Sequence, residues 1–161
     1  GEYMSLYSIK AQFIVTSSER IAAKYYSKDW PTLAEQRKFE GKLVAQRSQN
    51  PSDAVIIDDM LVVYRASSGT FFCVVGDMEE NPYILESALE SMFQSISTLL
   101  RGSVDRRTLL ENLDYVVLVM DEVIDKGVLL ENNYESIVER VSAESEVPLA
   151  EQSFAQAFQS A

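Results

Sequence analysis

Residues 54–75 read AVIIDDMLVVYRASSGTFFCVV, and this stretch decides the fold. It contains three short apolar runs, at residues 54–57, 60–64 and 71–75, separated by Asp58-Asp59 and by Ser67-Ser68-Gly69. Apolar runs of this length with turn residues between them predict three consecutive strands. Because the runs are apolar on both faces, we expect other elements to cover the resulting sheet on both sides.

The sequence before this stretch predicts a hairpin and a helix. Residues 7–15 alternate between apolar and polar side chains, as expected of a strand with one buried face. Turn residues at 16–19 lead to a second strand at 20–26, so the two strands form a hairpin. Trp30-Pro31-Thr32 then opens a helix that runs to about Gln46.

The sequence after this stretch is predicted to be helical. Apolar side chains between Ile84 and Leu100 occupy one half of a helical wheel, and Arg101-Gly102 forms a typical helix end. Residues 105–125 contain the apolar run 116–120, which locally resembles a strand. The whole segment has helical periodicity, so we predict one helix there. A further short element is expected at residues 134–141.

Together these elements predict an α+β domain with three layers. One helix covers one face of a five-stranded, antiparallel-rich sheet, and the two later helices cover the other face. The domain is expected to span residues 4–141. We expect Gly1-Glu2-Tyr3 to be a cloning remnant, and residues 142–161 to be a polar tail that is truncated at Ala161.

The composition argues against several classes of function. The 161 residues include 14 basic and 25 acidic side chains, a formal net charge of −11, which does not suit nucleic-acid binding. The absence of histidine removes the usual Ser-His and Cys-His nucleophile pairs. The single cysteine, Cys73, is expected to be a buried, inert thiol in a reducing compartment.

The search for motifs leads in the same direction. We find no glycine-rich phosphate loop, no signal segment and no stretch long enough to span a membrane. We therefore expect a cytosolic protein that is not an enzyme. It is expected to use no cofactor and no metal, and to bind neither nucleic acid nor a small-molecule substrate.

Several strings resemble those of the coatomer zeta-subunit family. RIAAKYY at residues 20–26, EQRKFE at 35–40 and VVYR at 62–65 resemble parts of its second strand, first helix and fourth strand. The closest resemblance is LLEN at 109–112 followed by DEVIDKGVLLE at 121–131. It runs from about residue 6 to residue 141, and the order and spacing of the strings make it specific. Clathrin adaptor sigma chains usually read Arg-Leu-Ser/Ala-Lys-Trp-Tyr in the second strand, a difference that favours zeta.

This resemblance implies the longin fold and a non-catalytic structural subunit of the COPI vesicle coat. Zeta subunits pair with the large gamma-coatomer subunit, and the coat returns cargo from the Golgi to the endoplasmic reticulum. A cytoplasmic protein is implied, peripheral on Golgi and COPI vesicle membranes through its complex. Two alternatives stay open: a sigma-type subunit of a clathrin adaptor, and a longin-type regulatory domain that binds a GTPase.

Seven residues are candidates for contact with a partner protein: Tyr25, Tyr26, Trp30, Glu40, Arg106, Arg107 and Leu118. The three aromatic residues cluster where the second strand meets the first helix, and they serve either in the core or as interface anchors. Glu40 lies within the apolar arc of that helix, between Leu43 and Leu33. We expect an ion pair or an interface contact there rather than a catalytic carboxylate.

The other candidates belong to the predicted third helix. Arg106 and Arg107 oppose the helix dipole at its start, which either favours an acidic partner or has no function. Leu118 lies in the middle of an acidic face, either as a single exposed leucine or as the centre of an interface. Asp121, Glu122 and Asp125 share that face. A solvated surface is favoured over a metal site there, because no glycine-bearing calcium loop accompanies them.

Overall fold

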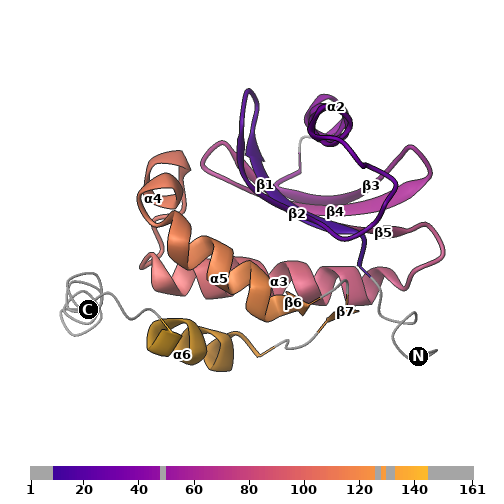
Figure 1. Ribbon diagram of the computed structural model, residues 1–161. Coiled ribbons are helices and arrows are strands. Elements are labelled where there is room, and N and C mark those ends of the chain that lie inside the picture. Colours follow the sequence, from indigo (N-terminus) through magenta and orange to yellow (C-terminus); the bar gives the residue numbers. More distant parts are fainter. Residues whose placement is uncertain (1–8, 48–49, 126–127, 130–132, 145–161) are drawn as a thin grey trace.

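The computed structural model describes residues 9–47, 50–125, 128–129 and 133–144, and its centre is a five-stranded sheet (Figure 1). The strand order is β2-β1-β5-β4-β3, and every neighbouring pair is antiparallel. The strands are β1 (Ala11–Thr16), β2 (Arg20–Tyr25), β3 (Ser52–Ile57), β4 (Met60–Ser67) and β5 (Thr70–Asp77). The predicted α+β class with its antiparallel sheet is therefore confirmed.

Tight turns connect β3, β4 and β5 into a meander. Asp58 and Asp59 form the two-residue turn between β3 and β4, and both have positive φ, 49° and 64°. Two positive values are typical of a type I′ turn, whose twist suits a hairpin and which aspartate tolerates. Ser68 and Gly69, with φ of 48° and 79°, form the next turn. The turn residues seen in the sequence thus set the register of the meander.

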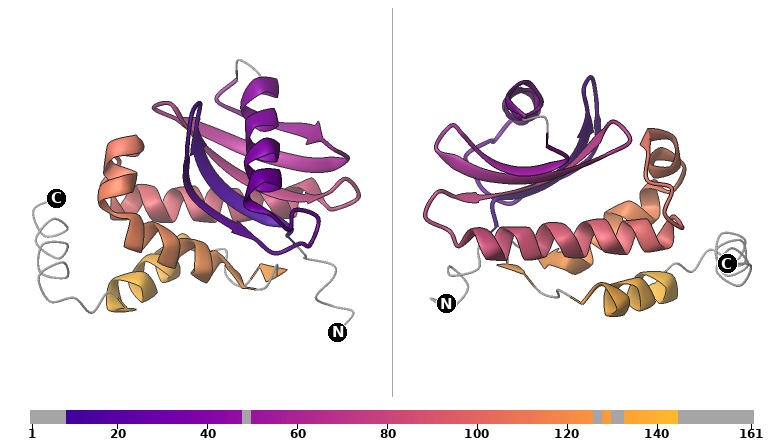
Figure 2. Two further views of the ribbon diagram at one scale, coloured as in Figure 1. Left: turned by 45° about the horizontal axis from the view of Figure 1, so that its top comes forward. Right: turned by 180° about the vertical axis from the view of Figure 1, so that it is seen from behind.

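Helix α2 (Leu33–Gln46) covers one face of the sheet (Figure 2). The Thr32 hydroxyl accepts a hydrogen bond from the Glu35 backbone N–H at 3.1 Å, which caps the start of the helix. Phe39 and Leu43 are buried, and they belong to a core cluster with Phe13 and Tyr64 of the sheet. This cluster also buries the thiol of Cys73, as expected from the sequence.

The opposite face is covered by helices α3 (Pro82–Leu99) and α5 (Leu113–Val123) (Figure 2). Helix α3 lies so close to β5 that a Cβ built on Gly76 would come within 2.8 Å of Leu85 Cδ2. Helix α6 (Tyr134–Glu144) packs on α3 and α5 from outside, and confirms the short element expected there. The two-residue strands β6 (Ile124–Asp125) and β7 (Val128–Leu129) pair between α5 and α6.

The single helix predicted for residues 105–125 is wrong, because the structure divides it at Asn112. Helix α4 (Arg106–Glu111) ends there, and α5 begins with the next residue. The backbone of Asn112 is not helical, with φ −123° and ψ 32°, and its side-chain amide donates to the Thr108 carbonyl at 2.8 Å. Asparagine side chains compete for backbone groups in this way. Helix α5 then ends at Val123, before the extended pair β6.

The sheet is covered on both faces, as expected, but β3 is covered less than the other strands of the meander. This strand lies at the edge of the sheet, and Ile57 is its only buried residue. Val55 packs partly against the α2 side, while Ile56, which points the other way, is 48% exposed. Because α3 packs mainly on β4 and β5, that part of the sheet is left open.

Candidate partner interface

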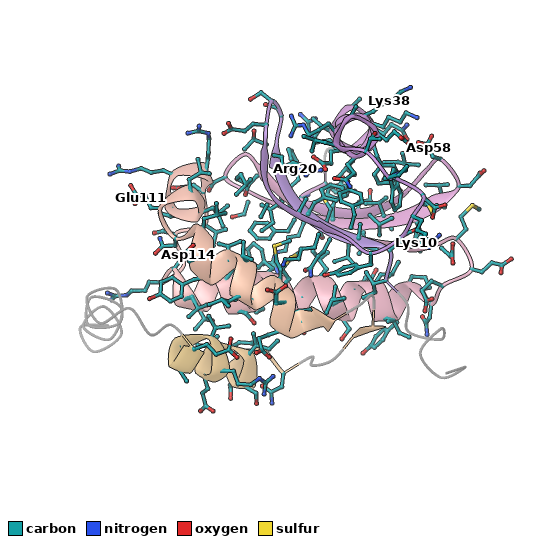
Figure 3. The ribbon with its side chains drawn as sticks, viewed as in Figure 1. Lys10, Arg20, Lys38, Asp58, Glu111 and Asp114 are labelled. Atoms are coloured by element: carbon teal, nitrogen blue, oxygen red, sulfur yellow. The ribbon has the colours of Figure 1, made fainter. Side chains whose placement is uncertain are left out.

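Among the candidate residues, Glu40 and Tyr25 lie in a buried polar network between β2 and α2. Glu40 is only 2% exposed. Both of its carboxylate oxygens accept a hydrogen bond from Arg20 Nε, at 3.2 Å for Oε1 and 3.1 Å for Oε2. Arg20 Nη2 also pairs with Glu40 and donates to Gln36 Oε1 at 3.0 Å. Arg20 is labelled in Figure 3, near the β1–β2 hairpin and α2. The Tyr25 hydroxyl donates to Glu40 Oε2 at 2.8 Å. The ion pair that we expected for Glu40 is present, inside the chain.

The same network sits on an aromatic cluster. The Tyr25 ring stacks with Phe13 at a centroid distance of 6.1 Å and meets Trp30 edge-on at 5.2 Å. Trp30 is 7% exposed and lies 4.8 Å from the Phe39 ring. Burial and the Glu40 carboxylate raise the pKa of Tyr25 well above its ordinary value. Trp30 and Glu40 are buried, so they can influence a partner surface only by shaping the elements around them, whereas Tyr25 is partly exposed.

Tyr26 does not belong to this cluster. Successive residues of a strand point to opposite faces, and Tyr26 packs partly against the core on the α5 side. Its hydroxyl accepts a hydrogen bond of 2.7 Å from Gln12 Nε2, which also donates to the Met120 carbonyl at 2.7 Å. The structure therefore separates the two tyrosines, and Tyr26 helps to hold β1 against α5.

Arg106 and Arg107 form an exposed basic surface at the start of α4. Arg106 pairs with Glu19, beside the turn between β1 and β2, and Arg107 Nε lies 3.0 Å from Glu111 Oε1. The hydrogen bond from Arg106 lowers the pKa of Glu19. Leu110, which is 39% exposed, follows Arg106 by four positions and Arg107 by three, so the three side chains are neighbours on the helix surface. We call these three residues the α4 patch.

Leu118 is less exposed than its place on the helical wheel indicated. It is half-buried and packs against the core cluster on the α3 and α5 side. The helical wheel predicted that the face of α5 carrying Leu118 is exposed to solvent. In the structure α6 packs on α5, so that part of the surface of α5 is covered. Its role as an interface centre stays a prediction, and its substitution also disturbs packing within the chain.

The acidic residues at the end of α5 form ion pairs. Asp121 Oδ1 lies 2.5 Å from Lys24 Nζ, and Glu122 Oε2 lies 2.9 Å from Arg140 Nε. A hydrogen bond with Glu122 raises the pKa of Glu144. Within the ranges that the structure describes, no group of three or more His, Cys, Asp or Glu side chains is arranged to hold a metal ion.

Several exposed apolar side chains were not identified from the sequence. Those of Leu33, Ile56, Met78, Tyr83, Leu110 and Tyr134 are at least 38% exposed. Leu33 was assigned to the apolar arc of α2, yet it lies in the first turn of the helix and is 62% exposed. For Leu110 a signal was available, since its spacing from Arg106 and Arg107 places it beside them. No helix among the described residues is both long and apolar enough to cross a bilayer.

Comparisons with known proteins agree with the fold. Residues 8–147 match the family described as clathrin adaptor complex small chain. Human coatomer subunit zeta-1 is 38% identical over 159 residues, which cover 98% of this chain and 90% of that protein. Mouse coatomer subunit zeta-2 is 40% identical over 98% of this chain and 78% of its own length. Rice coatomer subunit zeta-1 is 38% identical over 96% of this chain and 92% of its own.

A structural comparison gives the same architecture at lower sequence identity. The match is to a chain from a homology model of the full-length AP-3 complex in a stretched open conformation. The TM-score is 0.66 at 17% identity, and the match covers 90% of this chain and 98% of that one. At this identity the likeness concerns the fold alone.

Proposed function

The chain belongs to the clathrin adaptor complex small-chain family, and from this membership we propose that it is a zeta-type subunit of the COPI coat. In this proposal it pairs with the large gamma-coatomer subunit and serves transport from the Golgi to the endoplasmic reticulum. It acts in the cytoplasm, peripheral on Golgi and vesicle membranes through its complex, and performs no catalysis. The observation that carries the proposal is the 38–40% identity to coatomer zeta subunits over nearly the whole chain.

A subunit of this kind works by holding a rigid shape against its partner. Obligate interfaces are large and have an apolar centre with a polar rim. The α4 patch has this character on a small scale, because the exposed Leu110 is flanked by Arg106 and Arg107. We place a contact with the large subunit there. An apolar pocket with acidic residues at its edge would suit this patch.

The buried and half-buried candidates have a supporting role in the proposal. Tyr25, Trp30 and Glu40 tie α2 to the sheet, so that the surfaces on either side keep their geometry. Tyr26 does the same for α5 through Gln12. Leu118 of α5 packs partly against the core, so contact with a partner there would have to compete with packing inside the chain.

Co-purification tests the proposed partner. The tagged chain is co-expressed with gamma-coatomer or with the large chain of a clathrin adaptor, and recovery is compared. Stable one-to-one recovery with gamma-coatomer alone is expected. Recovery with an adaptor chain would make the protein a sigma-type subunit. Failure with every large chain, from a monodisperse monomer, would refute the coat-subunit proposal.

Three variants locate the contact in the same assay. Leu110→Asp is expected to reduce recovery at least about tenfold, since a carboxylate replaces the apolar centre of the patch. Leu33→Asp is the control, because Leu33 is also an exposed leucine, at 62% against 39% for Leu110, but lies on α2 at the opposite face. Leu118→Asp requires a thermal melt alongside, because Leu118 is half-buried. Unchanged recovery with Leu110→Asp would place the contact elsewhere.

A further inference from the structure

The open part of the sheet beside β3 forms a groove. Its floor consists of Ala54 of β3 and Val63 of β4, which pair directly and face the α3 side. Its wall is the first half of α3, with Glu86, Leu89 and Glu90. The volume is about 650 Å³, enough for several side chains of a docked segment. We call this hollow the β3 groove.

The backbone at the rim of the groove is ready to pair with a further strand. Ile57 and Met60 flank the two-residue turn, so they form a hydrogen-bonded pair with each other. By alternation, the backbone groups of Ser52, Ala54 and Ile56 point away from β4, toward the outside of the sheet. The Ala54 N–H is held by the exposed Asp53 carboxylate at 2.8 Å, a local bond that an incoming carbonyl can replace. An edge of this kind accepts an extended peptide.

The charge of the groove indicates what kind of segment can bind there. The basic residue in its lining, Arg65, is already engaged, because it pairs with Glu90 at 3.1 Å and lies over the Phe93 ring at 3.9 Å. Glu86 has no ion-pair partner within 4 Å among the described residues. The groove therefore has an excess of negative charge beside an apolar floor. It suits an extended segment whose side chains on the face toward α3, at every second residue, include both apolar and basic ones.

A basic segment of another protein is the occupant that this charge favours. Residues 1–8 and 145–161 contain no lysine or arginine, and a second copy would bring another −11 of net charge. We propose that the β3 groove binds an extended segment of another protein, which adds to β3 as a strand. Of its side chains that face α3, the apolar ones rest on the exposed Ala54 and the lysine or arginine ones face Glu86.

This site goes beyond the proposed pairing with a large subunit. The β3 groove lies at one edge of the sheet, while α4 packs near β2 at the other edge (Figure 1). One chain can therefore hold a large subunit through the α4 patch and an extended segment through β3 at the same time. The two contacts are independent, so that either proposal can fail without the other.

Peptide binding to the full chain tests the inference. The probe is the eight-residue peptide Lys-Thr-Val-Thr-Lys-Thr-Val-Thr, in which lysine and valine share one face of a strand. It is compared with the same peptide carrying glutamate in place of lysine, and with Lys-Val-Thr-Thr-Lys-Val-Thr-Thr, which has the probe's composition but places lysine and valine on opposite faces. Binding is followed by amide chemical shifts. We expect the probe alone to bind, with shifts concentrated in β3 and the first half of α3. It should also slow the hydrogen exchange of the outward-facing Ile56 amide.

Two variants of the groove, with one control variant, make the test specific. Glu86→Lys is expected to weaken binding about tenfold at low salt, with a smaller effect at high salt, because the charge contact is exposed. Glu139→Lys, on the exposed surface of α6, is the charge-matched control and should bind like the parent. Ala54→Pro removes an N–H that points away from β4, so the hydrogen bonds between β3 and β4 are kept. This variant should also weaken peptide binding. Neither Glu86→Lys nor Ala54→Pro should change recovery of the large subunit.

Any one of the following results would overturn the inference. Equal binding of the glutamate peptide would show that charge is not recognised, and equal binding of the opposite-face peptide would show that the shared face is not recognised. Unchanged affinity with Glu86→Lys, or shifts that map to α4, would place the peptide elsewhere. Tighter binding after removal of residues 145–161 would make the chain's own tail the occupant. Concentration-dependent dimerisation that the peptide reverses would make it a second copy.

Discussion

Replacing Arg20 by methionine tests how much the buried carboxylate of Glu40 depends on its partner. Arg20 contributes contacts to both carboxylate oxygens, and methionine retains most of the side-chain volume without the charge. Breaking a buried pair by removing one partner typically destabilises a protein by about 3–5 kcal/mol. We expect about 3 kcal/mol here. The Tyr25 hydroxyl at 2.8 Å and Arg37 Nη1 at 3.5 Å still reach the carboxylate, and the Arg20 side chain is 22% exposed.

A double-mutant cycle separates the pair from its surroundings. Arg20→Met combined with Glu40→Leu removes both charges, and apolar replacement of a buried pair is often neutral or stabilising. The double variant should therefore lose only about 1–2 kcal/mol, mainly because the Tyr25 hydroxyl loses its acceptor. The resulting coupling energy between the two positions is expected to be about 2 kcal/mol or more.

Urea unfolding followed by tryptophan fluorescence measures these differences. Trp30 is the single tryptophan of the chain and lies 5.2 Å from the Tyr25 ring, so its emission reports on the folding of this region. The Gln36→Ala variant, which removes an accessory acceptor for Arg20, should cost about 1 kcal/mol or less. A loss below about 1 kcal/mol for Arg20→Met would refute the reasoning, because the carboxylate would then be adequately solvated.

Three further predictions concern packing and ionisation. Gly76→Ala should destabilise the fold by about 1–3 kcal/mol, because the new Cβ would clash with Leu85. Gly41→Ala should instead stabilise it by about 0.5–1 kcal/mol, because Gly41 lies in α2 with open space around the position of a Cβ. Urea titrations of both variants and the parent measure these differences. Since the pKa of Tyr25 is raised in the folded chain, the unfolded chain loses this proton first near its ordinary value of 10.0. Stability should therefore fall as the pH rises above about 10, and Tyr25→Phe should flatten that slope in alkaline melts. Burial raises the pKa of the Cys73 thiol, so a thiol reagent at neutral pH should modify it only after denaturation; rapid labelling of the native chain would contradict its burial.

Most of the fold could be predicted because its local signals are strong. The turn residues at 58–59 and 67–69 divide the apolar runs into strands, and the long apolar stripe of α3 is unambiguous. The break at Asn112 could not be read from periodicity, since the apolar pattern continues across it. It depends on an amide that bonds to the Thr108 carbonyl. Whether the helix continues or breaks there depends on this one side-chain hydrogen bond, which a periodicity pattern does not include.

The candidate site was harder to predict, because its contacts join distant parts of the chain. The partner of Glu40 lies twenty positions earlier, in a different element, and periodicity does not identify it. The half-burial of Leu118 comes from packing against the core cluster on the α3 and α5 side, which a wheel drawn for a single helix does not include. The separation of Tyr25 from Tyr26 was predictable, however, since neighbouring residues of a strand face opposite sides.

The position of β1 in the sheet has a consequence for how the chain folds. β1 pairs with β2, its neighbour in sequence, but also with β5, so that Ala11 faces Val75. The meander from β3 to β5 needs only short loops and should form early, whereas the pairing of β1 with β5 closes a long loop and should form late. During synthesis from the N-terminus, we expect the edge of β1 in the β1–β2 hairpin to stay unpaired until β5 has been synthesised. A chaperone or a partner that shields this hairpin would then act on an assembly intermediate rather than on the finished domain.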